Sequence, residues 1–470
     1  MNYADAIQFL YNLRWFGAKL GLENTLQLAA LAGNPHQRLR FIHVAGTNGK
    51  GSTCAMLESV YRAAGLRVGM YTSPHLVAFG ERIQVNRRPV AEADVVRLVG
   101  ELQPLLKQFP AEHHPTFFEV VTVMALRYFA EQQCELVIWE TGLGGRLDST
   151  NIVTPLASVI TNIQYDHQRW LGETLDRIAA EKAGIIKPGV PVITATDEPE
   201  ALAVIQETAM QQHSPLTLVT PVHTQHPPLD TLRLPLLGWH QRMNAAVALA
   251  TVRGLQGHVP VRDAAIRQGL EAVKWPGRLQ LVEREFESRA GVSPALQGLL
   301  PSNSSNGSAL RGSEARGAGG TPALPYWQRI LLDGAHNSGG ATTLRAALEE
   351  HFPDVRPTII LGIMQDKDWD LMCEILAPVA ARILCSPVSS ERSADPEQLR
   401  EACRRTNPEA EVATFRSFAE ALTRAANDPF VVVAGSLYLI GEAMELLHLA
   451  ATPPSDEKGL NEWTAKAGSG

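Results

Sequence analysis

The stretch Phe41-Ile-His-Val-Ala-Gly-Thr-Asn-Gly-Lys-Gly-Ser-Thr53 runs from an apolar segment through a glycine-rich turn into a helical pattern that starts near Ala55. A strand, a glycine loop and a helix in this order form the setting that a phosphate-binding loop requires. Gly46, Gly49 and Gly51 let backbone N–H groups approach a polyphosphate, and the start of the helix favours its negative charge. This stretch therefore predicts a nucleotide-binding α/β domain.

The polar residues of the loop support the same interpretation. Lys50 can neutralise charge on the β- and γ-phosphates, and Ser52 or Thr53 can reach a phosphate or its magnesium ion. The spacing departs from the usual phosphate-loop pattern, because a glycine separates Lys50 from Ser52. A glycine turn that binds nothing is the alternative, but strand, lysine, hydroxyl and helix all fall in order.

Length and composition limit the class of protein. A chain of 470 residues is long enough for two domains. A net charge of −7 and a pI near 6.1 argue against a nucleic-acid partner. The five cysteines include no Cys-x-x-Cys pair, which is typical of reduced thiols. With no signal peptide and no bilayer-length apolar run, we expect a soluble, cytoplasmic protein.

Apolar strand-like runs alternate with helix-period segments through the first half of the chain. The expected strands are 41–45, 67–71, 136–140, 157–161 and 190–194. Amphipathic helical stretches occupy 91–107, 117–132 and 175–184. This alternation predicts a mostly parallel sheet covered by helices, with ligands at the carboxyl ends of its strands.

A second α/β series follows the middle of the chain and predicts a smaller Rossmann-like domain of four to six strands. Its expected strands are 330–332, 358–361, 382–385 and 430–434, and its expected helices are 339–350, 368–376, 396–405 and 417–426. We place the first domain at 1–275 and the second at 276–450. Within the second, 288–321 is rich in Ser, Gly, Ala and Pro and is expected to be a disordered insertion. Residues 451–470 are expected to be a flexible tail.

Polar residues recur at the predicted strand ends of the first domain. Ser73 follows the second strand, Glu140 ends the third, and His167 follows the fourth. A carboxylate ending an apolar strand is costly unless it binds something, and carboxylate oxygen is a natural ligand for a hard cation. Each residue alone has a structural alternative, such as a turn serine or a hydrogen-bonding histidine. Together they predict a shell for Mg²⁺ or Mn²⁺.

Other candidates are less specific from the residues alone. Lys182 lies near a helix end, where spacing favours a solvated lysine. Asn244 lies about one turn inside an Ala-rich helix, and Arg278 sits near the expected domain join. Asp333 and His336 follow the first strand of the second domain, and we expect both to face the cleft between the domains.

Several motifs along residues 1–450 resemble those of a known family, and they occur in that family's order. They are Gly46-Thr-Asn-Gly-Lys-Gly-Ser52, Thr72-Ser-Pro-His75, Glu140-Thr-Gly-Leu-Gly-Gly-Arg-Leu-Asp148, Asp166-His167, Glu181-Lys-Ala-Gly-Ile185, Pro276-Gly-Arg278 and Asp333-Gly-Ala-His-Asn337. In these the chain resembles the folylpolyglutamate synthase/dihydrofolate synthase family, a branch of the Mur ligase superfamily. The resemblance implies a Mur-type fold with a phosphate-loop ATPase domain and a Rossmann-like second domain.

The resemblance also implies ligands and catalytic roles. It implies ATP and two Mg²⁺ ions, with a carbamate on Lys182 beside the second ion. The metal ligands would be Ser73, Glu140 and His167. The implied catalytic residues are Lys50, Lys182, Asp333 and His336. The implied ATP contacts are Gly49, Lys50, Gly51, Ser52, Asn244, Arg278 and Asp333.

By the same resemblance, the pterin substrate would lie against two short stretches. Their residues are Thr116, Phe117, Phe118, Glu119, Leu147, Asp148 and Ser149. The implied reaction joins L-glutamate to a reduced folate, and also to dihydropteroate, through an acyl phosphate made with ATP. No nucleic acid or membrane is expected as a partner, and a monomer is expected.

Alternatives remain open at this point. The chain could be an enzyme that only extends the glutamate chain of folates. It could be a cell-wall Mur ligase, although the 45 residues before Gly46 are too few for that group's nucleotide-sugar domain. It could also be a phosphate-loop regulatory or nucleic-acid ATPase, or an inactive relative.

Overall fold

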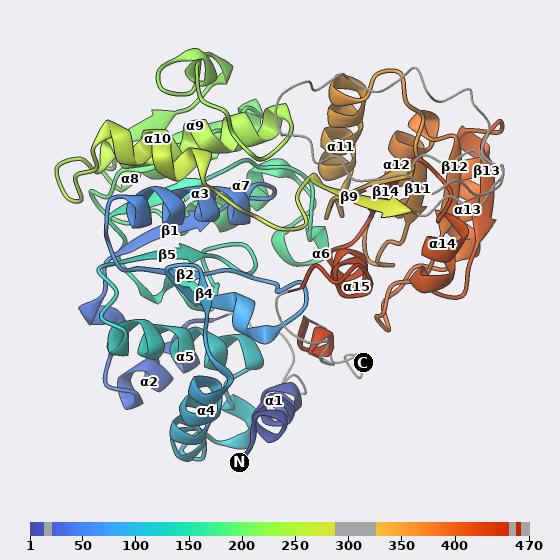
Figure 1. Ribbon diagram of the computed structural model, residues 1–470. Helices are drawn as coiled ribbons and strands as arrows, with labels where there is room; N and C mark the ends of the chain where they lie inside the picture. Colours follow the sequence, from blue (N-terminus) through green and yellow to red (C-terminus); the bar gives the residue numbers. More distant parts are fainter. Residues whose placement is uncertain (14–20, 287–325, 451–456, 462–470) are drawn as a thin grey trace, which may run out of the picture.

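The computed structural model describes residues 1–13, 21–286, 326–450 and 457–461. Within them the chain forms two α/β units side by side, each built on its own sheet (Figure 1). The predicted insertion at 288–321 lies outside the described residues. None of the helices in the described ranges has the length and apolar content needed to span a membrane.

The first sheet has eight strands in the order β4-β3-β2-β5-β1-β6-β7-β8. Pairing is parallel from β2 to β8, whereas β3 and β4 join antiparallel at one edge. The strands are β1 (Phe41–Ala45), β2 (Val68–Tyr71), β3 (Ile83–Val85), β4 (Arg88–Pro89), β5 (Leu136–Glu140), β6 (Ala157–Ile160), β7 (Val192–Thr194) and β8 (Leu216–Leu218).

Helices cover both faces of this sheet, which explains why its central strands are buried at every position. On one face α3, α9 and α10 pack together, and on the other α1, α2, α4 and α5 do (Figure 1). The helices are α1 (Tyr3–Asn12), α2 (Glu23–Leu31), α3 (Lys50–Ala63), α4 (Glu92–Leu106), α5 (Phe117–Glu131), α6 (Gln168–Leu171), α7 (Leu175–Ala183), α8 (Pro199–Gln211), α9 (Trp239–Gly254) and α10 (Asp263–Glu271).

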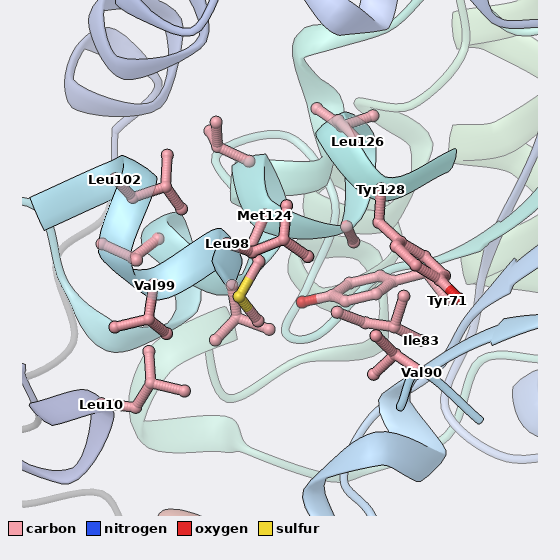
Figure 2. Close-up of a cluster of buried hydrophobic side chains, with 14 of the residues drawn as sticks. Leu10, Tyr71, Ile83, Val90, Leu98, Val99, Leu102, Met124, Leu126 and Tyr128 are labelled. Atoms are coloured by element: carbon pink, nitrogen blue, oxygen red, sulfur yellow. The ribbon is translucent and has the colours of Figure 1, made fainter. Parts of the chain in front are cut away.

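Figure 2 shows part of the core beneath the second of these helical layers. Leu98 and Leu102 of α4 meet Met124 of α5, and Leu10 joins them from α1. Tyr71, at the end of β2, lies in the same cluster. The end of β2 is therefore held by packing just before the chain enters the loop that carries Ser73.

The second sheet has six strands in the order β13-β12-β11-β14-β10-β9, all parallel except the β9–β10 pair. The strands are β9 (Gln280–Phe286), β10 (Tyr326–Leu332), β11 (Thr358–Leu361), β12 (Arg382–Cys385), β13 (Glu411–Thr414) and β14 (Phe430–Ala434). The helices are α11 (Ser338–His351), α12 (Trp369–Leu376), α13 (Pro396–Thr406), α14 (Phe418–Arg424) and α15 (Leu437–Leu446).

The predicted fold class is confirmed, with two α/β units and a mostly parallel first sheet. Predicted strands 41–45, 136–140, 358–361, 382–385 and 430–434 match the observed strands at both ends. Those at 67–71, 157–161 and 190–194 are one or two residues too long, and the one at 330–332 is the end of a longer strand. Short or amphipathic strands at or near the sheet edges, such as β8, β9 and β13, were not predicted.

The two units also touch through an apolar contact. Val77, from the loop after β2, is 1% exposed and packs in the core cluster of the second unit with Leu439 and Ile440. Leu76 packs against the same cluster. The loop that carries Ser73 is thus anchored in the second domain a few residues further on.

Residues 457–461 fall within the predicted flexible tail, yet they are docked on the first domain. They end in a short 3-10 helix, Lys458–Asn461. The Asn461 side chain accepts a hydrogen bond from Arg82 and donates one to the carbonyl of His75. The Glu457 carboxylate accepts the backbone N–H of Phe79. The prediction of a flexible tail fails for this docked segment, because Glu457 and Asn461 are buried and their polar groups are paired.

Candidate active site

Four strand ends converge at one edge of the first sheet. β1 lies between β5 and β6, and β2 lies beyond β5, all four in parallel. Their carboxyl ends therefore bring together the glycine loop, Glu140, the Asp166–His167 pair and Ser73. This is the edge at which parallel α/β sheets bind ligands.

The glycine loop leads directly from β1 into α3, whose first residue is Lys50. Gly49 precedes the helix with φ 82°, and Gly46 has φ 144°. A side chain on Gly46 would collide with Thr161, and one on Gly49 with Asn244. Both positions therefore need glycine, and Asn244 of α9 lies against the loop as the resemblance implies.

Lys50 folds back over its own loop. Its ammonium Nζ donates to the carbonyl oxygens of Gly46, at 3.0 Å, and Thr47, at 3.1 Å. These are weak substitutes for the oxygens of a phosphate, because a neutral carbonyl carries only part of a charge. The loop thus holds a lysine where an anion would bind.

Lys182, near the end of α7, reaches the same carbonyl. Its Nζ donates to Gly46 O at 2.8 Å, and the residue is only 5% exposed. Burial and the neighbouring charge of Lys50 lower the pKa of Lys182 to about 7. The residues alone favour a solvated lysine, and this prediction is wrong. The loop that follows β5 covers the helix end, with Gly145 against the carbonyls of residues 181 and 182.

Glu140 ends β5 and is 4% exposed. Burial raises its pKa to about 7, and Lys50 offsets only part of this effect. One carboxylate oxygen accepts the backbone N–H of Ser73 at 3.1 Å. Ser73 and Glu140 are therefore brought together as predicted, and a buried carboxylate beside a serine suits a hard cation.

The pair Asp166 and His167 follows β6, on the other side of β1. The Asp166 carboxylate accepts the His167 N–H at 2.8 Å and the ammonium of Lys367, from the second domain, at 2.5 Å. Burial alone would raise the pKa of Asp166. The nearby Lys367, His167 and His336 outweigh it and hold that pKa well below its usual range.

The predicted metal set is thus split between the two sides of β1. Ser73 and Glu140 lie on one side, whereas His167 Nε2 lies 3.5 Å from the Lys367 ammonium on the other. Across the described residues, no group of three or more His, Cys, Asp or Glu side chains is arranged to hold a metal ion. The donor chemistry fits a hard cation at Glu140. Beside His167, the cation that the structure contains is Lys367.

The second domain adds residues from the carboxyl end of β10. Asp333 is buried and accepts the backbone N–H groups of Leu279 and Ala335, both at 2.9 Å. His336 Nδ1 lies 2.8 Å from the Gly334 carbonyl, and its Nε2 lies 3.7 Å from Asp166. His336 faces the first domain, as predicted, whereas the hydrogen bonds of Asp333 stay within the second domain.

Arg278, at the domain join, is close to both charged strand ends. Its guanidinium lies against Gly334, and its charge acts on Asp333 and on Glu140. Burial raises the pKa of Asp333, and Arg278 counters this rise. The join thus carries a cation that neutralises carboxylates from both domains.

The predicted pterin region lies beside β2 and β5. Thr116 and Glu119 form a capping box at the start of α5, so both side chains bond to that helix's own backbone. Asp148 accepts the N–H groups of Gly142 and Leu143. These three polar side chains organise the local backbone.

The other predicted pterin contacts surround that region. Ser149 is hydrogen-bonded to Thr122, and Leu147 is half-buried. Phe118 lies 6.0 Å from the ring of Tyr71. Phe117 lies under the guanidinium of Arg82, with 5.3 Å between Arg82 Cζ and the ring centroid. Phe117 is thus buried beneath Arg82, and Phe118 is half-buried beside Tyr71 and Gly142.

Sequence reasoning missed three residues near this site. Arg82 is 3% exposed and donates from Nε to His75 Nδ1 at 2.9 Å. Asp166 was quoted within a motif but given no role, and Lys367 was not singled out. Lys367 lies a few residues beyond the end of β11, so the strand-end rule that found Glu140 could have found it.

Comparison with known proteins agrees with this architecture. The Mur ligase middle domain family matches residues 44–252, and the Mur ligase glutamate ligase domain family matches residues 326–437. The two-unit fold and the phosphate loop at the domain join are therefore those of a Mur ligase.

Full-length relatives narrow the class. The dihydrofolate synthase/folylpolyglutamate synthase of Bacillus subtilis is 32% identical over 95% of this chain and 99% of its own length. The Escherichia coli protein of the same name is 31% identical over 94% of this chain and 95% of its own length. The chain belongs to the dihydrofolate synthase/folylpolyglutamate synthase family, whose members are ATP-dependent ligases.

Solved structures support the same assignment. An E. coli structure with DHPP and ADP bound superposes with a TM-score of 0.75 at 30% identity, covering 96% of this chain and 98% of that one. The Mycobacterium tuberculosis folylpolyglutamate synthase, complexed with ADP and AMPPCP, gives 0.77 at 26% identity, covering 97% and 100%.

Proposed function

We propose that this chain joins L-glutamate to two acceptors, dihydropteroate and reduced folate, at the expense of ATP. The products are dihydrofolate and folylpolyglutamate. The observation that carries this proposal is the convergence of Lys50 and Lys182 on one carbonyl, that of Gly46, at the join of the two domains. The Lys50 ammonium, which only neutral carbonyls hold, suits a polyphosphate, and Lys182 lies beside it with a lowered pKa.

In the proposed reaction, an oxygen of the acceptor's carboxylate attacks the γ-phosphorus of ATP. The bond to the β-phosphate oxygen breaks, and ADP leaves with that electron pair. The α-amine of glutamate then attacks the acyl phosphate carbon. The tetrahedral intermediate collapses with loss of inorganic phosphate and a proton, which leaves an amide.

The protein's part is mainly to neutralise charge and align the reactants. Gly49, Gly51 and Ser52 would hold the phosphates from the start of α3, and Lys50 would turn from the loop carbonyls to the γ-phosphate. A magnesium ion held by Glu140 and Ser73 would neutralise phosphate charge; His167 is proposed for a second ion.

The environment of Lys182 supports the carbamate proposed there. Only a neutral amine attacks CO₂, and a lysine with a pKa of about 7 is substantially neutral at physiological pH. The carbamate would replace a buried positive charge with a negative one beside His167. A second cation would then be favoured at that position.

The remaining roles follow the same plan. Asn244, Arg278 and Asp333 are proposed to contact ATP, and His336 to orient phosphate or glutamate. The aromatic rings of Phe117 and Phe118 are proposed to receive the pterin, with Leu147 and Ser149 alongside. Thr116, Glu119 and Asp148 would support that pocket through the backbone they cap. We propose a monomer with domains at 1–275 and 276–450.

Phosphate release tests the proposal. Purified protein is given Mg·ATP and L-glutamate with either dihydropteroate or tetrahydrofolate, and products are identified by mass. Glutamate-dependent release with both acceptors supports both activities. Release with tetrahydrofolate alone leaves an enzyme that only extends folates, and release that needs no glutamate contradicts the ligase proposal.

A further inference from the structure

We infer that Lys367 is a positioning residue that clasps the second domain onto Asp166 of the first. This inference rests on the proposed function, because it concerns how the two halves of that ligase site are brought together. Lys367 lies between β11 and α12, in the second domain, and its ammonium reaches a carboxylate 201 residues earlier in the chain.

The turn that carries Lys367 is held on both sides. The Lys367 N–H donates to the Met364 carbonyl at 3.1 Å, and the Trp369 N–H donates to the Lys367 carbonyl at 2.8 Å. Met364 itself forms an antiparallel bridge with Ser393. The backbone beneath the lysine is therefore fixed, so the side chain starts from a defined position beside the first domain.

Asp166 receives the second domain through three side chains. Lys367 Nζ lies 2.5 Å from one carboxylate oxygen. Asn337 Nδ2 donates to the other at 3.0 Å, and His336 Nε2 lies 3.7 Å from it. The Lys367 and Asp166 side chains are only 10% and 8% exposed, so water screens their attraction little.

The clasp continues into the phosphate loop. Asn337 also exchanges hydrogen bonds with Asn48, at 3.1 and 3.2 Å, and Asn48 donates to Gln164 at 2.8 Å. A shift of Asp166 relative to Lys367 would therefore move Asn337 against the loop that holds Lys50. Errors of about 1 Å in such alignments cost on the order of a hundredfold in rate.

This chemistry separates the role of Lys367 from that of Lys50 in the phosphate loop. Lys50 rests on neutral carbonyls, which a phosphate can outcompete. Lys367 is already matched by a full negative charge at salt-bridge distance. It is thus held for the domain contact, and a phosphate gains less by displacing it.

The test compares Lys367→Ala, Lys367→Arg, Asp166→Asn and the Lys367→Ala/Asp166→Asn double variant. Arg405→Ala is the matched control, because Arg405 also pairs with an aspartate, but that pair lies within the second domain and the Arg405 side chain is 59% exposed. Each protein is first checked for an unchanged thermal midpoint. Steady-state kinetics with tetrahydrofolate then give kcat and KM for ATP and for glutamate.

Lys367→Ala is expected to lower kcat about 30- to 100-fold and leave KM for ATP within about threefold, since the phosphate loop stays intact. Lys367→Arg should recover at least about tenfold of that loss, because it restores the charge. The double variant should lose no more than the worse single variant, because both remove one interaction. Additive losses, or near-normal kcat in Lys367→Ala, would overturn the inference.

A second measurement does not depend on turnover. Small-angle X-ray scattering is recorded with and without Mg·AMPPCP and tetrahydrofolate. The wild-type radius of gyration should fall on addition of ligands, and that fall should be lost in Lys367→Ala and kept in Arg405→Ala. An equal fall in Lys367→Ala would contradict the clasp. Wild type that closes but makes no product would instead contradict the proposed function alone.

Discussion

Two buried carboxylates stand on either side of β1, and their surroundings differ in kind. Glu140, on the β5 side, has its hydrogen bond from Ser73 of the same domain, and its pKa is raised to about 7. Asp166, on the β6 side, is paired with Lys367 of the other domain, and its pKa is held well below the usual range.

The difference shows how one sheet edge can hold two kinds of cation. A carboxylate that is buried with too little positive charge around it is partly protonated near neutral pH, and a bound cation would displace that proton. A carboxylate whose cation comes from another domain stays ionised as long as that domain is in place. Glu140 is therefore suited to binding a metal ion, whereas the ionisation of Asp166 depends on where the second domain lies.

The largest effect should come from Lys50, which lies between the two sides. Lys50→Ala removes the cation that acts on Glu140 and would meet the γ-phosphate, so we expect kcat to fall about a thousandfold or more. Glutamate-dependent phosphate release measures the loss, and circular dichroism checks the fold. Near-normal release would contradict the site as a whole.

Glu140→Gln tests the metal side alone and should lower kcat by about a hundredfold or more. In wild type a proton must leave Glu140 before a cation binds, and its pKa is about 7. Mn²⁺ affinity, measured by calorimetry, should therefore tighten as pH rises from 6 to 8, and Glu140→Gln should lose that dependence. Glu349→Gln, at an exposed glutamate in an ion pair of the second domain, is the control. An unchanged pH dependence in Glu140→Gln would assign the cation to other ligands.

Lys182→Met tests the lowered pKa of Lys182 through the pH dependence of folding stability. The folded-state pKa of Lys182 is about 7, against an ordinary value of 10.5, so between these values the unfolded chain binds more protons than the folded one. Wild-type stability at this site should rise as pH increases from 7 to 10.5, and the variant should lack that part of the rise. Thermal midpoints at pH 7, 8.5 and 10, with CO₂ excluded, give the two slopes. Parallel slopes would contradict the lowered pKa.

The smallest effect on turnover should come from the apolar domain contact. Val77→Ala removes two methyl groups from a buried cluster and should cost about 1–2 kcal/mol of stability. Apolar packing has little direction, so we expect kcat to change by less than about threefold. Chemical denaturation and kinetics measure the two quantities. A loss as large as that of Lys367→Ala would mean that both contacts set the alignment.

Much of the fold could be predicted from the sequence because its central strands are buried on both faces. Phe430–Ala434 is apolar at every position and Phe41–Ala45 is apolar except at His43, and both runs match strands of the same bounds. β9 and β13 are the edge strands of the second sheet and carry charged residues, so they lack a continuous apolar run. Their pairing depends on neighbours distant in sequence.

The site was predicted unevenly for a related reason. Glu140 and His167 follow strands and could be placed by topology, whereas the burial of Lys182 depends on a loop from another part of the chain. The Lys367–Asp166 contact joins separate domains, and no local pattern encodes it. The family resemblance implied a place for Lys182 in the site, but it gave no partner for Asp166.

The short segment at 457–461 has a mechanical consequence. The chain passes from the first domain into the second near β9, and after α15 it returns to bind Arg82 and His75 of the first domain. The second domain is therefore linked to the first at two points. One link would allow rotation about any axis, whereas two links favour rotation about the line that joins them. Each time the two domains close, this rotation should bring Lys367 back to Asp166.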